Sequence, residues 1–181
     1  INIGDFDKGI EIIPSIESIL HLLQQKTYKR SEYILYYNTA YLYFGEGSYA
    51  KSLYWLNKIV HGDKDNNLTE DAKVIYAFAK IFNLIIHFEL GNYDMLENLV
   101  KSTRRFLQKR ERLYKFEKLI LDFFRIKLPK VNSRQQQVSA FKKLKKEIEI
   151  VVADPFEKEA LKYFDLISWA ESKIEKKSFA D

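Results

Sequence analysis

The chain of 181 residues contains no cysteine, and this absence excludes several kinds of site. Disulfide scaffolds, zinc sites built on thiolates, iron–sulfur clusters and cysteine nucleophiles all need that side chain. Glycine and proline are also scarce, with 6 and 3 residues, which is too few for the many turns of an all-β fold. No apolar run approaches the roughly 20 residues of a membrane-spanning helix, and no signal peptide is visible. We therefore expect an all-helical, cytoplasmic protein.

The residues that are present have a composition typical of a globular domain. Hydrophobic residues make up 46% of the chain and charged residues 30%. A chain of this length can bury roughly 70% of the surface that it exposes when unfolded, so its core needs no crosslinks. Lysine outnumbers arginine by 23 to 7, and Ile, Phe, Tyr and Asn are abundant. This bias favours a bacterial source with an AT-rich genome.

The net charge of +5 is distributed unevenly. Residues 101–146 contain 16 Lys and Arg but only 3 Asp and Glu, so the rest of the chain is acidic. Such a basic field attracts anionic partners and speeds their encounter, but it does not choose among them. Solvated helix faces would produce the same charge pattern without any partner.

Three short segments of similar sequence recur along the chain. Residues 4–6, 47–49 and 91–93 read Gly-Asp-Phe, Gly-Ser-Tyr and Gly-Asn-Tyr, at spacings of 43 and 44 residues. Each segment predicts a corner between two helices, in which the glycine takes a left-handed conformation and the polar residue caps the next helix. The aromatic residue is expected to pack in the corner.

Apolar periodicity predicts about eight helices. They span residues 6–25, 30–45, 48–61, 69–89, 93–109, 112–128, 134–152 and 155–176. Thr69 suits a helix start, and Pro129 separates the sixth helix from the seventh. The segment 154–157, Asp-Pro-Phe-Glu, resembles a capping box with proline at the first helical position.

The corner motif, with an aromatic-rich helix before it and an amphipathic helix after it, resembles the tetratricopeptide repeat (TPR) family. The best unit runs from Tyr33 to about Lys64. Its packing positions are Tyr36, Thr39, Ala40 and Tyr43 in the first helix, and Gly47, Tyr49, Ser52, Leu56 and Ile59 in the corner and second helix. The resemblance covers about residues 1–110. The period of 43–44 residues exceeds the usual length of about 34, so the helices would be longer.

The resemblance implies an all-α fold in which antiparallel helix pairs form a right-handed stack, a TPR-like α-solenoid. We expect residues 1–130 to form the repeats and residues 131–181 to form a C-terminal helical pair that caps the same domain. A HEAT-like stack is the alternative, because its period is also near 44 residues.

The chain opens just before its first glycine corner, which suggests a fragment of a longer helical protein. The first predicted helix would then lack its neighbour. We therefore expect its apolar flank to be exposed or to associate with another copy of the chain. That flank comprises Ile10, Ile13, Ile16, Leu20 and Leu23.

The sequence shows no constellation typical of an enzyme. Its three histidines, His21, His61 and His87, have no His or acidic neighbour at metal-ligand spacing. No phosphate-binding glycine loop and no nucleophile elbow is present. We therefore predict no catalytic, cofactor or metal site.

A polar stripe interrupts the otherwise apolar helix predicted at 69–89. It comprises Lys73, Lys80, Asn83 and His87. Such a stripe must face water, a buried polar network or a ligand groove. In helical-repeat stacks the inner helices line a concave binding surface, and Tyr37 and Tyr41 lie off the packing face predicted for their helix. These six residues are the predicted partner-binding groove.

Two functions compete on these observations. The first is a non-catalytic scaffold that binds a protein or peptide through its concave face, with an acidic partner as a candidate. The second is nucleic-acid binding through the basic segment 101–146, although no known nucleic-acid motif is present. The basic patch for this second function is Arg104, Arg105, Lys109, Arg110, Arg112 and Lys115, followed by Lys142, Lys143, Lys145 and Lys146.

Overall fold

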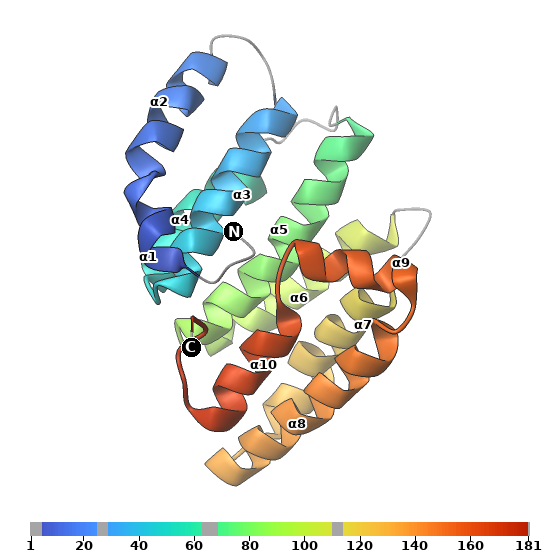
Figure 1. The fold of residues 1–181 in the computed structure, drawn as a ribbon. Coiled ribbons are helices and arrows are strands. Elements are labelled where there is room, and N and C mark those ends of the chain that lie inside the picture. Colours follow the sequence, from blue (N-terminus) through green and yellow to red (C-terminus); the bar gives the residue numbers. More distant parts are fainter. Residues whose placement is uncertain (1–4, 25–28, 63–68, 110–113, 181) are drawn as a thin grey trace. The chain divides into compact units, whose positions relative to one another are not determined.

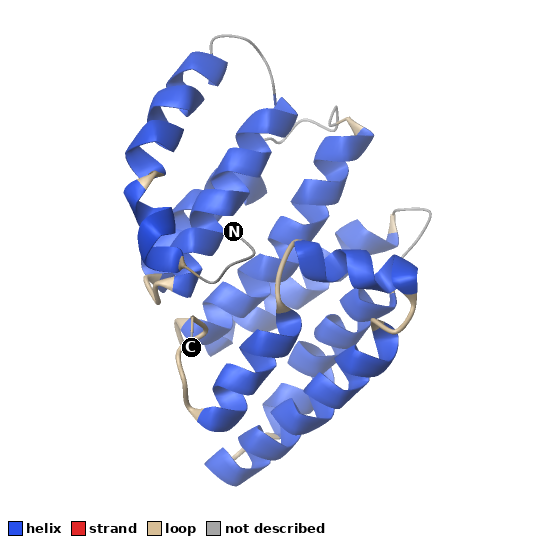
Figure 2. Cartoon of the chain, viewed as in Figure 1, coloured by secondary structure: helices blue, strands red, loops and turns tan. Residues whose placement is uncertain are grey.

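The computed structural model describes residues 5–24, 29–62, 69–109 and 114–180. Within these ranges the chain is helical and contains no strand (Figure 2). The all-α prediction is therefore confirmed for the described residues. The chain divides into two compact units, Ile1–Gly91 and Asn92–Phe179. This division lies at the third glycine corner, and each unit is described by itself.

The first unit contains five helices in chain order (Figure 1). They are α1 (Phe6–Glu11), α2 (Ile13–Gln24), α3 (Lys29–Gly45), α4 (Tyr49–Val60) and α5 (Glu70–Glu89). Helix α3 is central, because it packs against each of the other four. Thr69 caps α5 as predicted, its hydroxyl accepting a hydrogen bond of 3.4 Å from the amide of Ala72. Most of these helix bounds agree with the sequence to within one residue.

The α3–α4 hairpin has the small-residue contact that the repeat pattern predicts. Thr39 and Ala40 of α3 are fully buried, as are Ser52 and Leu56 of α4. The hydroxyl of Ser52 donates a 2.6 Å hydrogen bond to the carbonyl of Ala40, so the two helix backbones approach closely. Small side chains at both positions permit this approach, and the hydrogen bond satisfies the buried hydroxyl.

The glycine corners have the predicted backbone conformation where the structure describes them. Gly47 has φ +85° and Gly91 has φ +73°, both in the left-handed region. At the first of these corners the amide of Ser48 donates to the carbonyl of Tyr43 at 2.8 Å, the long-range bond of a Schellman motif. Gly4 lies outside the described residues. Ser48 and Asn92 stand at the N-caps of their helices, but neither side chain makes the capping hydrogen bond.

The aromatic residues of the three corners behave differently. Phe6 is buried and its ring centroid lies 5.8 Å from that of Tyr41, while Tyr49 packs on Phe44 at 5.1 Å. Tyr93 is 56% exposed. The expected packing in the corner is therefore confirmed for Phe6 and Tyr49, whereas more than half of the Tyr93 side chain faces outward.

The first predicted helix is in fact two helices, and its apolar flank is packed. The break at Ile12 is explained by Pro14, which has no amide hydrogen to donate to the carbonyl of Ile10. Ile13, Ile16 and Leu20 are each at most 8% exposed. The expectation that this flank is exposed or covered by another copy is therefore wrong for these three residues, because α2 packs on α3.

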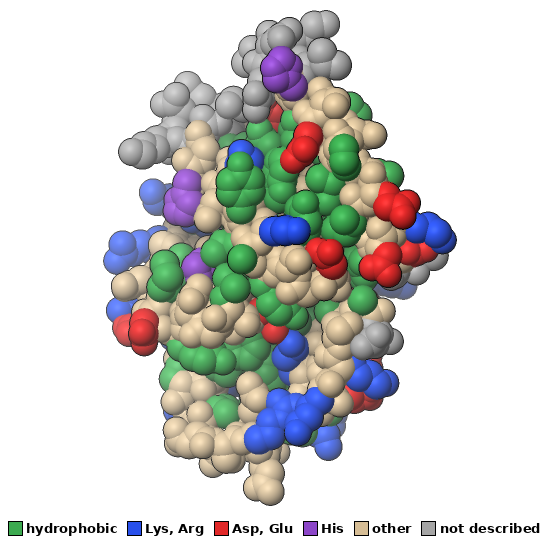
Figure 3. Space-filling model, turned by 90° about the vertical axis from the view of Figure 1, so that its left-hand side faces the viewer, with side chains coloured by type: hydrophobic (Ala, Val, Ile, Leu, Met, Phe, Trp, Pro, Cys, Tyr) green, Lys and Arg blue, Asp and Glu red, His purple; other side chains and the backbone are tan. Residues whose placement is uncertain are grey.

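Two other isoleucines of the same region are exposed instead. Ile12 is 53% exposed and Ile19 is 47% exposed. Figure 3 looks onto the side of the molecule on which α1 and α2 lie in Figure 1, and it shows hydrophobic side chains with charged ones scattered among them. Ile10 is half-buried, and the side chain of Leu23 lies outside the described residues.

The second unit contains shorter and more interrupted helices. They are α6 (Tyr93–Gln108), α7 (Lys115–Asp122), the π turn η1 (Phe123–Lys127), the 3-10 turn η2 (Leu128–Lys130), α8 (Arg134–Val151), α9 (Pro155–Lys158), the 3-10 turn η3 (Glu159–Lys162) and α10 (Leu166–Glu175). Its core is aromatic, with ring centroids of Phe123 and Phe141 5.0 Å apart and those of Phe141 and Trp169 5.3 Å apart. Helix α8 packs on α7 and α10.

The predicted helix 155–176 is divided by Asp165. One carboxylate oxygen of Asp165 accepts hydrogen bonds from the amides of Ile167 and Ser168, at 3.1 and 2.9 Å. This side chain therefore starts a new helix, α10, in the middle of the expected one. Among the described residues, none of these helices combines the length and the apolar character needed to cross a membrane.

Candidate anion-binding pocket between α6 and α7

The predicted polar stripe of α5 is largely buried. Asn83 is 3% exposed and His87 is 6% exposed, whereas Lys73 and Lys80 are half-buried. Among the residues that the structure describes, the Oδ1 atom of Asn83 finds no hydrogen-bond partner. Of the three surroundings considered for the stripe, exposure to water therefore does not apply to Asn83 and His87.

Burial changes the ionisation of this stripe. It lowers the pKa of Lys80, whose Nζ atom lies 5.3 Å from the centroid of the Tyr76 ring. Burial, together with repulsion from His61, lowers the pKa of His87. His87 is therefore neutral at physiological pH. Burial is also the main reason that the pKa of Tyr49 rises to about 12, with the nearby carboxylate of Glu89 adding to the effect.

The two tyrosines predicted to line a groove contact the core instead. Tyr37 is 4% exposed, and its ring centroid lies 5.6 Å from that of Phe82. Tyr41 is half-buried, 6.2 Å from Phe82 and 5.8 Å from Phe6. The inference that Tyr37 lies off the packing face is wrong, because α5 covers that side of α3. A role of the α5 stripe and these tyrosines in partner binding stays a prediction.

The described members of the predicted basic patch differ in their surroundings. Arg104 is half-buried, Arg105 and Lys109 are exposed, and Lys115 forms an ion pair of 3.2 Å with Asp154. Arg110 and Arg112 lie outside the described residues. Of the described members, Arg104 lines a pocket between α6 and α7, and Lys115 lines a second hollow along α7.

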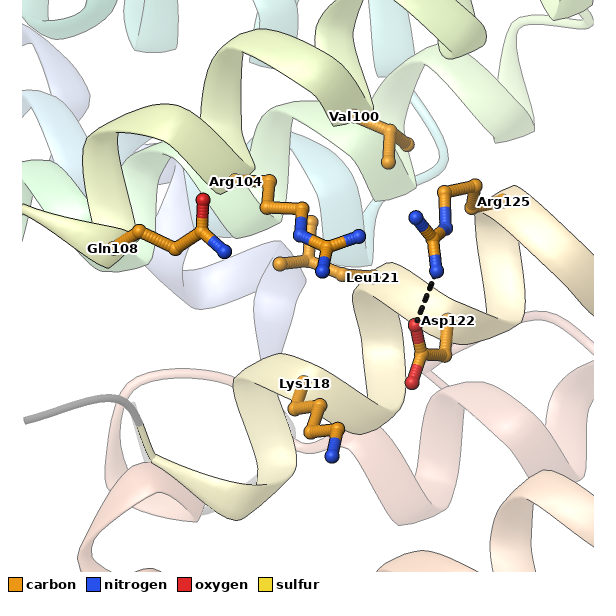
Figure 4. A pocket seen from close by; sticks show the side chains of 7 residues that line it. All are labelled: Val100, Arg104, Gln108, Lys118, Leu121, Asp122 and Arg125. Carbon is orange, nitrogen blue, oxygen red and sulfur yellow. Dashed lines mark hydrogen bonds and ion pairs between the residues drawn. The ribbon is translucent and has the colours of Figure 1, made fainter.

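This pocket lies between α6 and α7 and has a volume of about 250 Å³. Its lining residues are Val100, Arg104 and Gln108 from α6, with Lys118, Leu121, Asp122 and Arg125 from α7 and η1 (Figure 4). On each element the spacing follows the helical repeat, at i, i+4 and i+8 on α6 and at i, i+4 and i+7 for the charged residues of α7 and η1. The apolar floor is formed by Val100 and Leu121, which are buried.

The charges around the pocket are unbalanced. Arg104, Lys118 and Arg125 bring three cations, and Asp122 brings the single carboxylate. Figure 4 shows Arg104 extending from α6 toward α7, and the ion pair of 3.4 Å between Arg125 and Asp122. Within the described part of the chain, neither Arg104 nor Lys118 makes an ion pair or a side-chain hydrogen bond. The pocket can therefore accept an anionic group, which guanidinium side chains bind through paired hydrogen bonds.

Helix α7 is held in place by a buried carboxylate from α9. Glu157 is 3% exposed, and its oxygens accept hydrogen bonds from the amides of Lys115 at 3.0 Å and Phe116 at 3.3 Å. These are amides of the first turn of α7, which have no partner within the helix. Glu117 completes the cap, its carboxylate accepting from the amide of Tyr114 at 3.0 Å. The orientation of Lys118 and Asp122 in the pocket therefore depends on this cap.

The capping box predicted at 154–157 is only half correct. Asp154 does accept a hydrogen bond from the amide of Phe156, at 3.0 Å. Glu157 does not close the box, because its two oxygens bind the start of α7. Beside this contact, the rings of Tyr114 and Phe156 stack at 4.7 Å with an interplanar angle of 9°. Sequence spacing alone could not indicate a cap between residues 41 and 42 positions apart.

A second hollow, with a volume of about 350 Å³, lies along α7 toward α8. It shares Lys118 and Asp122 with the first pocket and also includes Leu119, Ile126 and Glu147. Lys115 and Lys127 complete its lining, and each is paired, with Asp154 and Glu147 respectively. Among the described residues, no group of three or more His, Asp or Glu side chains is placed to hold a metal ion.

Comparison of the sequence with known protein families, with curated proteins and with solved structures finds no match.

Proposed function

We propose that this chain is a non-catalytic helical-repeat scaffold that binds an acidic segment of a protein partner in the pocket between α6 and α7. One observation carries the proposal. Three cations surround the pocket and a single carboxylate opposes them, and two of those cations, Arg104 and Lys118, have no anionic partner in the described chain. A carboxylate of a partner would supply the missing counter-charge.

The ion pair already in the pocket would not prevent this binding. Arg125 and Asp122 are separated by 3.4 Å, and their side chains are 44% and 34% exposed. Exposed pairs of this kind stabilise a protein by about 0–1 kcal/mol. A partner carboxylate can therefore share or replace Asp122 at Arg125 at little cost.

The scaffold part of the proposal rests on the hairpin geometry. The α3–α4 hairpin has a left-handed glycine corner and the close contact of Ala40 with Ser52 that stacked helix pairs use. A second left-handed corner follows 44 residues later, at Gly91. These features favour a TPR-like right-handed stack over unrelated helices, with a HEAT-like stack as the alternative.

Binding of a labelled glutamate-rich peptide, followed by fluorescence anisotropy, tests this function. A peptide with glutamine in place of glutamate is the control ligand. We expect the glutamate peptide alone to bind, and Arg104→Glu to weaken its binding by at least about tenfold, since a hydrogen bond to a charged group contributes about 1.5–3 kcal/mol.

The matched control is Lys142→Glu, an exposed position on α8 outside both hollows that changes the net charge equally. Screening over a Debye length of about 8 Å should limit its effect to about threefold at physiological salt. Equal losses in both variants would show that a diffuse field, not the pocket, attracts the peptide. No binding by the unaltered chain would refute the acidic-segment proposal.

Nucleic-acid binding is the second candidate, and exposed cations on two helices favour it. Arg105 and Lys109 on α6 are exposed, as are Lys142, Lys143 and Lys146 on α8. A gel shift at low salt with single-stranded and duplex oligonucleotides would retard a phosphate-binding protein. In that case Lys142→Glu should weaken binding about as much as Arg104→Glu, which is the opposite of the result expected for a peptide in the pocket.

A further inference from the structure

The exposed ridge of α7 separates two hollows of different chemistry. Lys118 and Asp122 stand on the ridge and line both. On the α6 side the hollow contains the unpaired Arg104 and the weakly paired Arg125. A ligand long enough to cross the ridge would therefore meet a basic hollow first and a second hollow beyond it.

The π turn at the end of α7 supplies one residue to each hollow. In η1 the amide of Leu128 donates to the carbonyl of Phe123, five residues back. This wider turn lets two successive rings, Phe123 and Phe124, both be buried, while the next two residues face outward. Arg125 lines the basic hollow and Ile126 lines the second one. Such π turns are rare in helices and are found frequently at functional sites.

The second hollow can accept an apolar group. Its two lysines other than Lys118 each have a carboxylate partner, Lys115 in Asp154 and Lys127 in Glu147. The remaining wall is mostly hydrocarbon, from Leu119 and from Ile126, which is 41% exposed. A large aliphatic side chain left this exposed gains from being covered by another apolar group.

We propose that the partner segment carries two kinds of anchor, a carboxylate for the basic hollow and one large aliphatic side chain for the hollow at Ile126. This inference rests on the proposed function and specifies its ligand. The occupant is an acidic segment of another protein, because the charge of the first hollow requires an anion and the second requires hydrocarbon on the same chain. A purely polyanionic ligand would use only the first hollow.

Two peptide sets and two isoleucine variants test this pattern. The first set contains short glutamate-rich peptides with one leucine placed at successive positions, and the second contains the same peptides with serine in place of leucine. The variants are Ile126→Ser in the hollow and Ile150→Ser on α8, where the side chain is 66% exposed and lines neither hollow. Circular dichroism establishes that each variant is folded.

We expect at least one leucine position to improve binding to the unaltered chain by about fivefold to tenfold, as partial burial of an aliphatic side chain allows. Ile126→Ser should abolish this improvement without changing binding of the serine peptides, and Ile150→Ser should leave both sets unchanged. If no leucine position improves binding while Arg104→Glu still weakens it, the apolar anchor is refuted and the proposed function stands. If no acidic peptide binds at all, the proposed function fails and this inference fails with it.

Discussion

Replacement of Glu157 by alanine tests how the pocket is held. In the folded chain its carboxylate accepts two backbone hydrogen bonds from the first turn of α7, at 3.0 and 3.3 Å, and it is 3% exposed. Alanine would leave the amides of Lys115 and Phe116 without acceptors. Phe116 is buried, so water cannot replace the lost partner there.

The magnitude follows from the two bonds. A hydrogen bond to a charged group contributes about 1.5–3 kcal/mol, and we assign the lower value to the longer bond, from the amide of Phe116. We therefore expect Glu157→Ala to lower the free energy of unfolding by about 3 kcal/mol. For a chain of this size that corresponds to a fall in Tm of roughly 6–12 °C. Glu157→Gln keeps one acceptor oxygen but loses the charge, and it should cost about half as much.

Thermal and urea denaturation followed by circular dichroism provide the assay. The matched control is Glu149→Ala on α8, which removes an exposed carboxylate that pairs with Lys145 at 3.3 Å. The control should cost less than about 1 kcal/mol. If Glu157→Ala were no more destabilising than Glu149→Ala, the long-range cap could not be what fixes α7.

Three further outcomes are expected. Gly47→Ala should destabilise the chain by about 1 kcal/mol in urea denaturation, because φ is +85° and no neighbouring atom blocks the added methyl group. Because burial lowers the pKa of His87 in the folded chain, the unfolded chain takes up the proton first as the pH falls below the ordinary value of 6.5, and the folded state loses stability. Tm should therefore fall as the pH is lowered below that value, and it should fall less in His87→Gln. If Tm depended on pH equally in both chains, the burial of His87 would be contradicted. Arg104→Glu should leave Tm within about 2 °C of the unaltered chain, since within the described residues Arg104 makes no ion pair or side-chain hydrogen bond whose loss would lower stability.

The helices could be predicted because their signals are local. Left-handed glycines, polar N-caps and apolar spacing act within a few residues, so Gly47, Gly91 and Thr69 marked real helix ends. The errors within helices were also local and could have been avoided. Pro14 removes an amide in the third turn of the first predicted helix, and Asp165 caps a new helix inside the last predicted one.

The faces that meet could not be predicted, because they depend on a third helix. Tyr37 looked free when α3 was considered with α4 alone, but Phe82 of α5 covers it. Asn83 and His87 are also buried, although their polarity suggested an outward face. For Tyr37 the covering side chain lies 45 positions away in the sequence.

The pocket was predicted only through Arg104. Its other cations, Lys118 and Arg125, belong to α7 and η1, which follow α6 after a connecting segment. No sequence rule predicts which face of α6 meets which face of α7. The spacing of Val100, Arg104 and Gln108, and that of Lys118, Asp122 and Arg125, was nevertheless visible as two helical stripes. The cap from Glu157, which holds the α7 stripe opposite the α6 stripe, could not be predicted from the sequence.

An NMR titration of the isotope-labelled chain with a glutamate-rich peptide tests the pocket most directly. The side-chain Nε–H signals of arginine report which guanidinium groups meet the ligand. We expect the signals of Arg104 and Arg125 to shift with the same saturation, while that of Arg134, at the start of α8 and outside both hollows, stays unchanged. Shifts confined to the lysines of α8, or no shift at Arg104 at saturating peptide, would contradict the assignment of this pocket as the binding site.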